Sequence, residues 1–187
     1  MPAPDLRAGD GGATRLGDAV AEATRRLAEA GVESIRIGTK EMAFYPQRFD
    51  RTFFEMLDRF HETYPQVGLH MMLHFEHPDE ILAKGPDGEY IRDEQGFLQW
   101  IPATGKAMRG FATRGWITVE NQSPIIKGIN DDADVLETLF RGLVRHRVRP
   151  YYLLQADVVR GTGHLRPPLD LSLVHIVPCG RPPEHSA

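Results

Sequence analysis

The stretch LHFEHPDEI places two imidazoles and three carboxylates within nine residues, directly after an apolar run. Alternation along a strand would put the side chains of His70, His74 and Glu76 on the same side of the chain. Because imidazole and carboxylate groups together suit a divalent metal ion, a metal-dependent hydrolase using the His70–His77 cluster is one hypothesis. Against it, the sequence contains no H-E-x-x-H helix, and His164 is the only obvious remote ligand. We therefore expect no metal site.

Polar or ionisable residues also follow the other apolar runs of the chain, at 39–40, 127–132 and 155–157. In α/β sheets, ligands bind outside the carboxyl ends of the strands, so these residues could line one binding site. Polar loops need no ligand to explain them, however. The pattern by itself favours neither interpretation.

Asp157 follows the apolar stretch YYLLQA, where a carboxylate is placed to hold an ammonium or guanidinium group of a ligand. It could instead pair with Arg160 or Arg166. The glycine-rich GTGHL nearby is not a G-x-G-x-x-G fingerprint, and the chain has no G-x-S-x-G nucleophile elbow. These motifs therefore point neither to nucleotide binding nor to a serine hydrolase, and no catalytic residue is assigned from the pattern.

The elements that must position these residues alternate between strand and helix. Apolar runs predict four strands, SIRIG, VGLHMMLHF, WITVENQSPII and VRPYYLLQ. Amphipathic helices are predicted over 18–30, after the cap residue Asp50, and from Asp131 or Asp132 to His146. This alternation is typical of βαβ units, so the expected fold class is α/β with a parallel sheet. A complete (β/α)₈ barrel needs about 250 residues, so this chain can hold only part of one.

One domain accounts for most of the chain. We expect residues 1–13 to form a poorly ordered tail, because they are rich in Pro and Gly, and residues 171–187 to form an irregular second tail. Residues 14–170 then hold the partial barrel. Within it, the turn signals PDG and EQG flank EYIR and predict a surface excursion at 84–115 that contains a β-hairpin.

Composition narrows the partners and the compartment. A net charge of −4 gives no reason to expect nucleic acid, and no apolar run is long enough to span a membrane. Because the N-terminus has no signal-peptide core, the chain is expected in the cytoplasm. Cys179 is the only cysteine, so this sequence by itself can build neither a disulfide nor an iron–sulfur cluster with three or four Cys ligands.

Four segments occur in a distinctive order: IRIGTKEMAFYPQRF, HFEHPDEI, ENQSPIIKGINDD and RPYYLLQADVVRGTGHLRPPL. They resemble the lysine 2,3-aminomutase family of radical S-adenosylmethionine enzymes. Its patterns are approximately R-I-G-[ST]-R…P-Q-R, H-F-N-H-P-x-E, N-Q-[ST]-x-L-L-x-G-x-N-D and P-Y-Y-x-x-Q-x-D…G-x-x-H-F-R, in this order. Each motif is modest alone, but four in succession are specific, and the match covers the region from about residue 30 to residue 170.

The resemblance implies a partial parallel barrel and a reaction that migrates an amino group between adjacent carbons of an amino acid substrate. The family uses a [4Fe–4S] cluster, S-adenosylmethionine and pyridoxal phosphate, which the protein orients. By the same resemblance, the side chains beside S-adenosylmethionine are those of His74, Asn121 and Gln122. Asp157 matches the acid that holds the distal amino group of a diamino acid, and Arg36 and Arg48 help to shape the barrel mouth.

The chain also departs from the family. The cluster cysteines of the family precede the first motif, where this sequence has none, and the pyridoxal-phosphate lysine lies near the family's C-terminus, whereas Lys127 is the last lysine here. We therefore expect a truncated or split aminomutase-like protein that holds at most S-adenosylmethionine and needs a second polypeptide for the cluster. The alternative is a non-catalytic ligand-binding or degraded remnant. Because an incomplete barrel exposes an edge strand and apolar surface, homo-oligomers are also expected.

Overall fold

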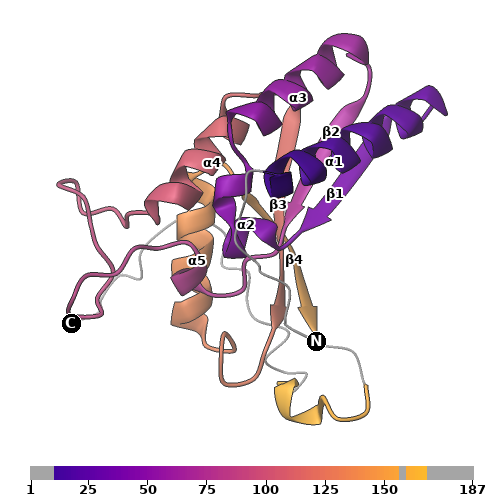
Figure 1. Ribbon diagram of the computed structural model, residues 1–187. Coiled ribbons are helices and arrows are strands. Elements are labelled where there is room, and N and C mark those ends of the chain that lie inside the picture. The colour runs from indigo at the N-terminus through magenta and orange to yellow at the C-terminus, as the bar shows by residue number, and fades with distance from the viewer. Residues whose placement is uncertain (1–10, 156–158, 168–187) are drawn as a thin grey trace, which may run out of the picture.

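A four-stranded, fully parallel sheet lies at the centre of the computed structural model, which describes residues 11–155 and 159–167 (Figure 1). The strands are β1 (Ser34–Thr39), β2 (Gly68–Leu73), β3 (Ile117–Ile125) and β4 (Arg149–Gln155). They lie side by side in chain order, and each consecutive pair is parallel. The predicted α/β class and its four strands are therefore confirmed, and the open sheet is that of a partial barrel.

Helices cover one face of this sheet (Figure 1). The longer ones are α1 (Gly11–Glu29), α3 (Arg51–Thr63), α4 (Pro102–Ala112) and α5 (Ala133–Arg145). The short ones are α2 (Glu41–Phe44) and the 3₁₀ helices η1 (Pro46–Arg48) and η2 (Pro78–Glu80). Another 3₁₀ helix, η3 (Gly163–Leu165), lies beyond the carboxyl ends of the strands (Figure 1). None of the helices in the described part of the chain is both long and apolar enough to cross a membrane.

Capping side chains begin two of the helices, as the sequence predicts. Asp50 accepts a hydrogen bond from the backbone N–H of Phe53 at 2.9 Å, at the start of α3. Asp132 accepts from two backbone N–H groups in the first turn of α5. Each cap satisfies donors that the first helical turn leaves unpaired. Of the two residues proposed for α5, Asp132 rather than Asp131 is the cap.

Two helices differ from the expectation. The first, α1, begins at Gly11, before the predicted start at residue 18 and within the segment expected to be a tail. No proline interrupts the stretch between these positions, so the helix can begin several residues before the predicted start. The second, α4, occupies part of the predicted surface excursion, yet its Met108 and Phe111 are buried in the core. Its sequence signal is weak because much of its inner face consists of small residues.

The remainder of the excursion, residues 82–100, is a hairpin-like arm. Three antiparallel bridges hold it together, between Leu82 and Trp100, Lys84 and Tyr90, and Arg92 and Leu98. Gly88 and Gly96 lie at its turns with φ of 85° and 82°, a left-handed conformation that glycine adopts without strain. The base of the arm is fixed to α5, because the indole N–H of Trp100 donates to the carbonyl of Gly142 at 3.3 Å.

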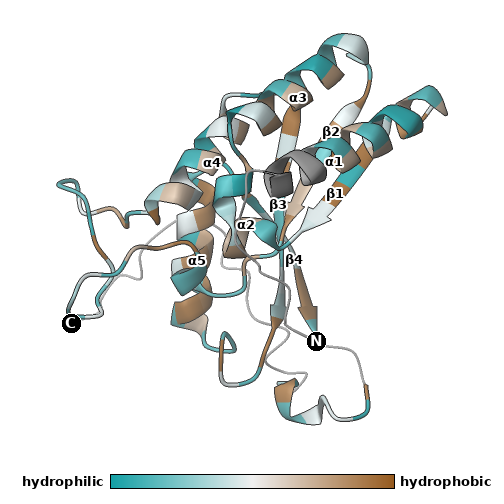
Figure 2. Cartoon of the chain, in the orientation of Figure 1, coloured by the Kyte–Doolittle hydropathy of each residue, from teal (hydrophilic) through white to brown (hydrophobic). Residues whose placement is uncertain are grey.

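The hydrophobic core fills the space between the helices and the sheet, where hydrophobic residues gather in Figure 2. Alternate strand residues enter it, and these are Ile35, Leu69, Met71, Leu73, Ile117 and Val119. Rings of Phe49, Phe53, Phe54 and Phe111 pack edge-on or tilted beside them, with centroids as close as 4.9 Å. Because successive side chains of a strand point to opposite faces, the remaining strand residues point away from the helices.

Candidate functional site

The face of the sheet opposite the helices is called the open face below. Arg36 of β1, His70 of β2 and Gln122 of β3 alternate with core residues along their strands and therefore point to this face. The three strands are parallel, so their carboxyl ends lie at one edge of the sheet. His74 follows β2 directly at that edge. Of the predicted site residues, His74 and Gln122 thus lie at the edge where α/β sheets bind ligands.

His74 and Gln122 are in direct contact across the ends of β2 and β3. Nε2 of the imidazole and Nε2 of the amide are 2.7 Å apart. An amide nitrogen can only donate, so in this arrangement the imidazole Nε2 accepts and the neutral ring carries its proton on Nδ1. Gly38 of β1 lies beneath the ring, where an added Cβ would be 3.7 Å from Nε2. The pair therefore offers a ligand an imidazole N–H and an amide oxygen side by side.

The surroundings keep the His74 ring neutral. Burial lowers the pKa of His74 below its ordinary value because it disfavours the charged form, and the positive charge of Lys40 lowers this pKa further. The carboxylate of Glu76 opposes both effects. A neutral ring at neutral pH is consistent with the accepting role of Nε2 in the contact with Gln122.

Lys40 forms a compact ion-pair network beside this imidazole. Its ammonium group lies 2.9 Å from a carboxylate oxygen of Glu76 and 2.9 Å from one of Glu80. It also donates to the backbone carbonyl of His74 at 3.2 Å. All three charged side chains are between 21% and 27% exposed, so water screens them only in part. The sequence placed residues 39–40 among the polar residues that could line a binding site, but it could not predict this ion pairing, because the pairing spans two loops.

Asn121 does not lie beside His74 and Gln122. It precedes Gln122 on β3 and so points to the opposite face, where it is 1% exposed. Its Oδ1 accepts from the backbone N–H of Phe75 at 2.8 Å, and its Nδ2 donates to the carbonyl of Phe75 and to Oγ of Ser123. The amide thus continues the pairing between β2 and β3 beyond the last regular hydrogen bonds. In this structure its contacts are structural rather than part of the predicted pocket.

The two predicted arginines lie in different surroundings. Arg36 is exposed on the open face, and its guanidinium carbon is 5.8 Å from the centroid of the Tyr151 ring on β4. Arg48 lies in η1, where its Nη1 is 2.9 Å from a carboxylate oxygen of Glu41 in α2. The structure therefore does not bring the two guanidinium groups into one contact. Asp157, the predicted substrate-binding acid, lies outside the described residues.

Glu120 is a buried acid that sequence reasoning missed. It lies on β3 two residues before Gln122, which places it on the same open face, and it is 4% exposed. Nη1 of Arg149 on β4 lies 3.7 Å from a carboxylate oxygen of Glu120. The available signal was a carboxylate within the apolar stretch WITVENQ, where a buried charge needs a partner or a ligand.

Among the residues that the structure describes, no group of three or more His, Cys, Asp or Glu side chains is arranged to hold a metal ion. Glu76 pairs with Lys40, and His77 accepts a hydrogen bond from the backbone N–H of Asp79 at 3.2 Å. The side chains of the His70–His77 cluster therefore do not converge. In this part of the chain the hydrolase hypothesis has no metal site.

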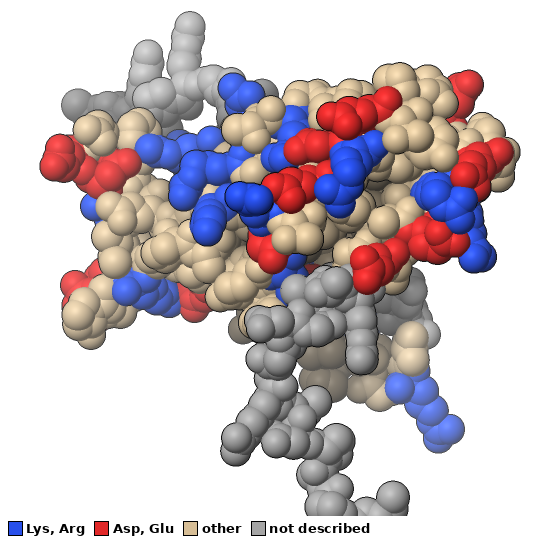
Figure 3. Space-filling model, turned by 45° about the horizontal axis from the view of Figure 1, so that its top comes forward, with Lys and Arg blue, Asp and Glu red and all other residues tan. Residues whose placement is uncertain are grey.

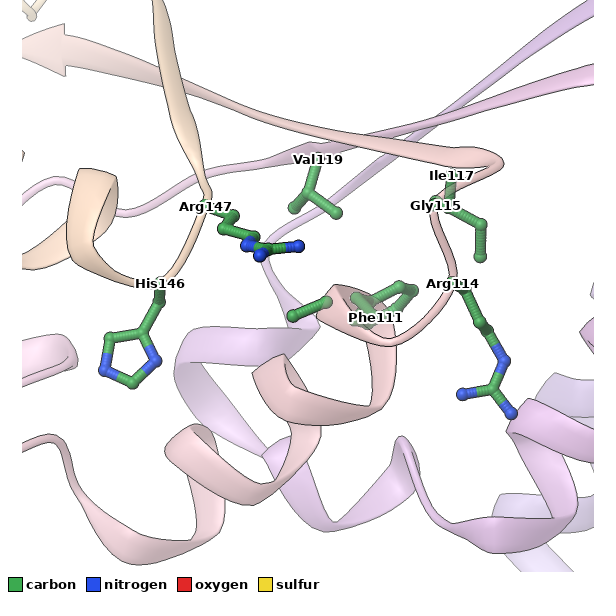
Figure 4. Close-up of a pocket in the computed structure, with 8 residues that line it drawn as sticks. Phe111, Arg114, Gly115, Ile117, Val119, His146 and Arg147 are labelled. Atoms are coloured by element: carbon green, nitrogen blue, oxygen red, sulfur yellow. The ribbon is translucent and has the colours of Figure 1, made fainter.

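A cavity of about 190 Å³ lies at the other end of the sheet, far from His74 along the strands (Figure 4). Phe111, Val119 and the loop between α5 and β4 line it. Figure 4 shows Arg147 reaching across the cavity, whereas His146 and Arg114 point away from it. Its lining is a mixture of apolar and polar groups, and none of the predicted site residues contributes to it.

Charged residues of both signs are interspersed on the face of the molecule drawn in Figure 3. Elsewhere in the structure, ion pairs form within single helices, such as Arg25 with Glu29 in α1 and Arg141 with Glu137 in α5. Such pairs solvate a surface and contribute little to stability.

Comparison with known proteins yields a consistent set of relatives. The chain is 32% identical over 167 residues to the L-lysine 2,3-aminomutase of Acetoanaerobium sticklandii, which covers 88% of this chain and 34% of the relative. It is 32% identical over 138 residues to the L-lysine 2,3-aminomutase of Fusobacterium nucleatum, and this match covers 74% of this chain and 26% of the relative. It is 30% identical over 139 residues to the glutamate 2,3-aminomutase of Clostridioides difficile, and this match covers 74% of this chain and 27% of the relative. No protein-family model matches. The chain spans about a third of the length of these relatives or less.

Proposed function

Because the chain belongs to the lysine 2,3-aminomutase family, we propose that it forms the S-adenosylmethionine-binding wall of an amino-acid aminomutase. The reaction would be the migration of an amino group between adjacent carbons of an amino acid. The observation that carries this proposal is the contact between His74 and Gln122 at the carboxyl edge of a parallel sheet. Both residues stand in the motifs by which the sequence resembles the family.

The residues at this edge fit S-adenosylmethionine chemically. The ligand carries both hydrogen-bond acceptors and donors, and the neutral imidazole and the amide of Gln122 together present a donor and an acceptor. Glu120 adds a buried carboxylate on the same face, which suits a cationic ligand such as a sulfonium or an ammonium group. In the family, S-adenosylmethionine when bound supplies a 5′-deoxyadenosyl radical.

The residues present do not fit the other two cofactors of the family. A [4Fe–4S] cluster needs three or four cysteine ligands, and this sequence contains Cys179 alone. The family's pyridoxal-phosphate lysine lies near its C-terminus, whereas the last lysine here is Lys127. No step through either group is assigned to these residues. The cluster ligands and the lysine would have to come from polypeptide outside this sequence.

The role of the chain's own residues is therefore to bind and orient. His74, neutral and bonded through Nε2 to Gln122, would donate from Nδ1 to an acceptor on the ligand. Gln122 would hold the imidazole in this orientation while its amide oxygen accepts a proton donor. Pre-oriented groups of this kind lower the entropic cost of binding because they lose little freedom when the ligand arrives.

A second polypeptide, or a second copy of this chain, would cover the unpaired parts of the sheet. Within the described residues β4 pairs with β3 alone, and its Tyr152 and Leu154 are 47% and 40% exposed. An uncovered edge strand with exposed apolar side chains favours association. This supports a partner that completes the barrel, and it makes a homo-oligomer an outcome that light scattering would reveal.

Calorimetric titration with S-adenosylmethionine tests the proposal directly. We expect His74→Ala and Gln122→Ala each to weaken binding about tenfold, since each removes a polar contact worth about 1.4 kcal/mol. His70→Ala is the matched control, because His70 points to the same face four residues earlier, on β2, and lies outside the pair. Equal binding by all variants, or no binding by the wild-type chain, would contradict the proposed site.

The single cysteine favours a second candidate function, which is binding without catalysis. Anaerobic reconstitution with iron and sulfide distinguishes the two, with and without a co-expressed cysteine-rich partner from a neighbouring reading frame. We expect 5′-deoxyadenosine to form under reduction only when the partner is present. Binding of S-adenosylmethionine without cleavage in either case would favour the ligand-binding alternative.

A further inference from the structure

The loop after β1 and the loop after β2 are joined through one ammonium group. Nζ of Lys40 contacts Glu76 and Glu80 at 2.9 Å each and donates to the carbonyl of His74 at 3.2 Å. The second carboxylate oxygen of Glu80 accepts from the backbone N–H of Glu76 at 2.7 Å. Lys40 and Glu80 therefore hold the backbone on both sides of Phe75 at once.

These contacts hold the backbone that carries the His74 side chain. The segment that the two residues hold begins with His74, whose imidazole extends to Gln122. A loop that is free to move would carry the ring away from the amide, because no regular strand pairing reaches His74. Asn121 and Ser123 hold the backbone of the next residue, Phe75, and Lys40 adds a hydrogen bond to the carbonyl of His74 itself. Because this bond is charge-assisted, it is stronger than a neutral one.

We propose that Lys40 is a positioning residue for His74, holding its backbone in place and, with Glu76, setting the charge that the imidazole experiences. The ligand-binding consequence rests on the proposed function, whereas the effect on His74 itself does not. Lys40 contacts neither His74 Nε2 nor Gln122 in the structure, so it acts through the loop and through its field rather than through the ligand.

Two charged groups set the electrostatic environment of the ring. Lys40 approaches from the β1 side and Glu76 from the loop after β2, while Gln122 on β3 and Gly38 on β1 contribute no charge. The ammonium group disfavours protonation of the ring, and the carboxylate favours it. Removing one or the other should therefore move the His74 titration in opposite directions, a pattern that simple loosening of the loop cannot produce.

The test is a ¹⁵N-detected titration of His74 in the full chain, with its resonances identified by their loss in His74→Asn. We expect Lys40→Met to raise the pKa of His74 and Glu76→Gln to lower it. Lys40→Arg keeps the charge and should leave the titration as in the wild type. Lys84→Met is the matched control, since Lys84 forms its ion pair with Asp79 at 2.7 Å in the next loop and should leave His74 unchanged.

The ring nitrogens supply a second readout if one variant folds poorly. Their ¹⁵N shifts report the proton on Nδ1 in the wild type, and we expect a mixture of tautomers in Lys40→Met once the contact with Gln122 loosens. Shifts of equal sign in Lys40→Met and Glu76→Gln, or an unchanged titration and tautomer in Lys40→Met, would overturn the inference.

Titration with S-adenosylmethionine then separates this inference from the proposed function. We expect Lys40→Met to bind about tenfold more weakly and Lys40→Arg to restore binding. If the wild-type chain does not bind, the proposed function fails, while the His74 titration still decides the role of Lys40. If the wild type binds and Lys40→Met binds equally well with an unchanged titration, the role of Lys40 fails and the proposed site stands.

Discussion

Replacing Asn121 by alanine separates what holds the site from what contacts a ligand. The Asn121 amide accepts from the backbone N–H of Phe75 at 2.8 Å, and Phe75 is fully buried. In Asn121→Ala this N–H loses its acceptor, which costs about 1–3 kcal/mol. The carbonyl of Phe75 keeps the hydroxyl of Ser123 at 2.7 Å, so the lost amide donor adds only about 1 kcal/mol. We expect a total loss of about 2–4 kcal/mol.

That loss is large against the stability of an ordinary domain, which is about 5–15 kcal/mol. Urea unfolding followed by fluorescence of Trp100 and Trp116 measures it. With a slope of about 2 kcal/mol per molar, the midpoint should fall by about 1–2 M. Gln122→Ala is the comparison, because the neighbouring side chain is half-buried and makes one side-chain contact, with His74. We expect it to lower the unfolding free energy by about 1 kcal/mol, the usual net worth of one hydrogen bond, while weakening ligand binding.

The two variants are informative together because they sit next to each other on β3 and point to opposite faces. A midpoint for Asn121→Ala within error of the wild type would refute the argument that its amide extends the pairing of β2 and β3. A larger stability loss in Gln122→Ala than in Asn121→Ala would refute the division of roles between the two faces.

Two further predictions concern the end of α5. Burial, with a smaller contribution from Arg145, lowers the pKa of His146 from its ordinary value of 6.5 to about 4. The folded state therefore keeps this histidine neutral, and its stability is complete above pH 6.5 and is lost as the pH falls toward 4, where the unfolded chain binds the proton more readily. His146→Phe, which can retain the ring contact with Trp100, should flatten the pH dependence of the urea midpoint over this range, and an unchanged slope would contradict the assignment. Arg147 has φ of 61° at the end of α5, where glycine carries no steric penalty, so Arg147→Gly should raise the unfolding free energy by about 0.5 kcal/mol. A lower melting temperature in Arg147→Gly would contradict this prediction. It would mean that the contacts of the Arg147 side chain at the cavity contribute more to stability than the strained backbone costs.

The sequence by itself determined the architecture and the family. Apolar runs separated by amphipathic helices can form little other than a parallel α/β sheet, and all four predicted strands are present in chain order. The cap at Asp50 could also be predicted from the sequence, because capping is a local interaction between one residue and the first turn of the helix that follows it. Helix α4 could not be predicted from the sequence, because small residues form much of its inner face. Its burial depends on tertiary packing, including its contact with η1.

Only the tertiary structure decided which side chains meet. His74 and Gln122 are 48 positions apart and touch because β2 and β3 are parallel neighbours. Asn121 adjoins Gln122 in the chain yet lies on the opposite face, because successive residues of a strand alternate in direction. The network around Lys40 depends on two loops that end at the same edge of the sheet. Local sequence specifies what each strand is, whereas register and pleat, which are properties of the assembled sheet, specify which of its residues can act together.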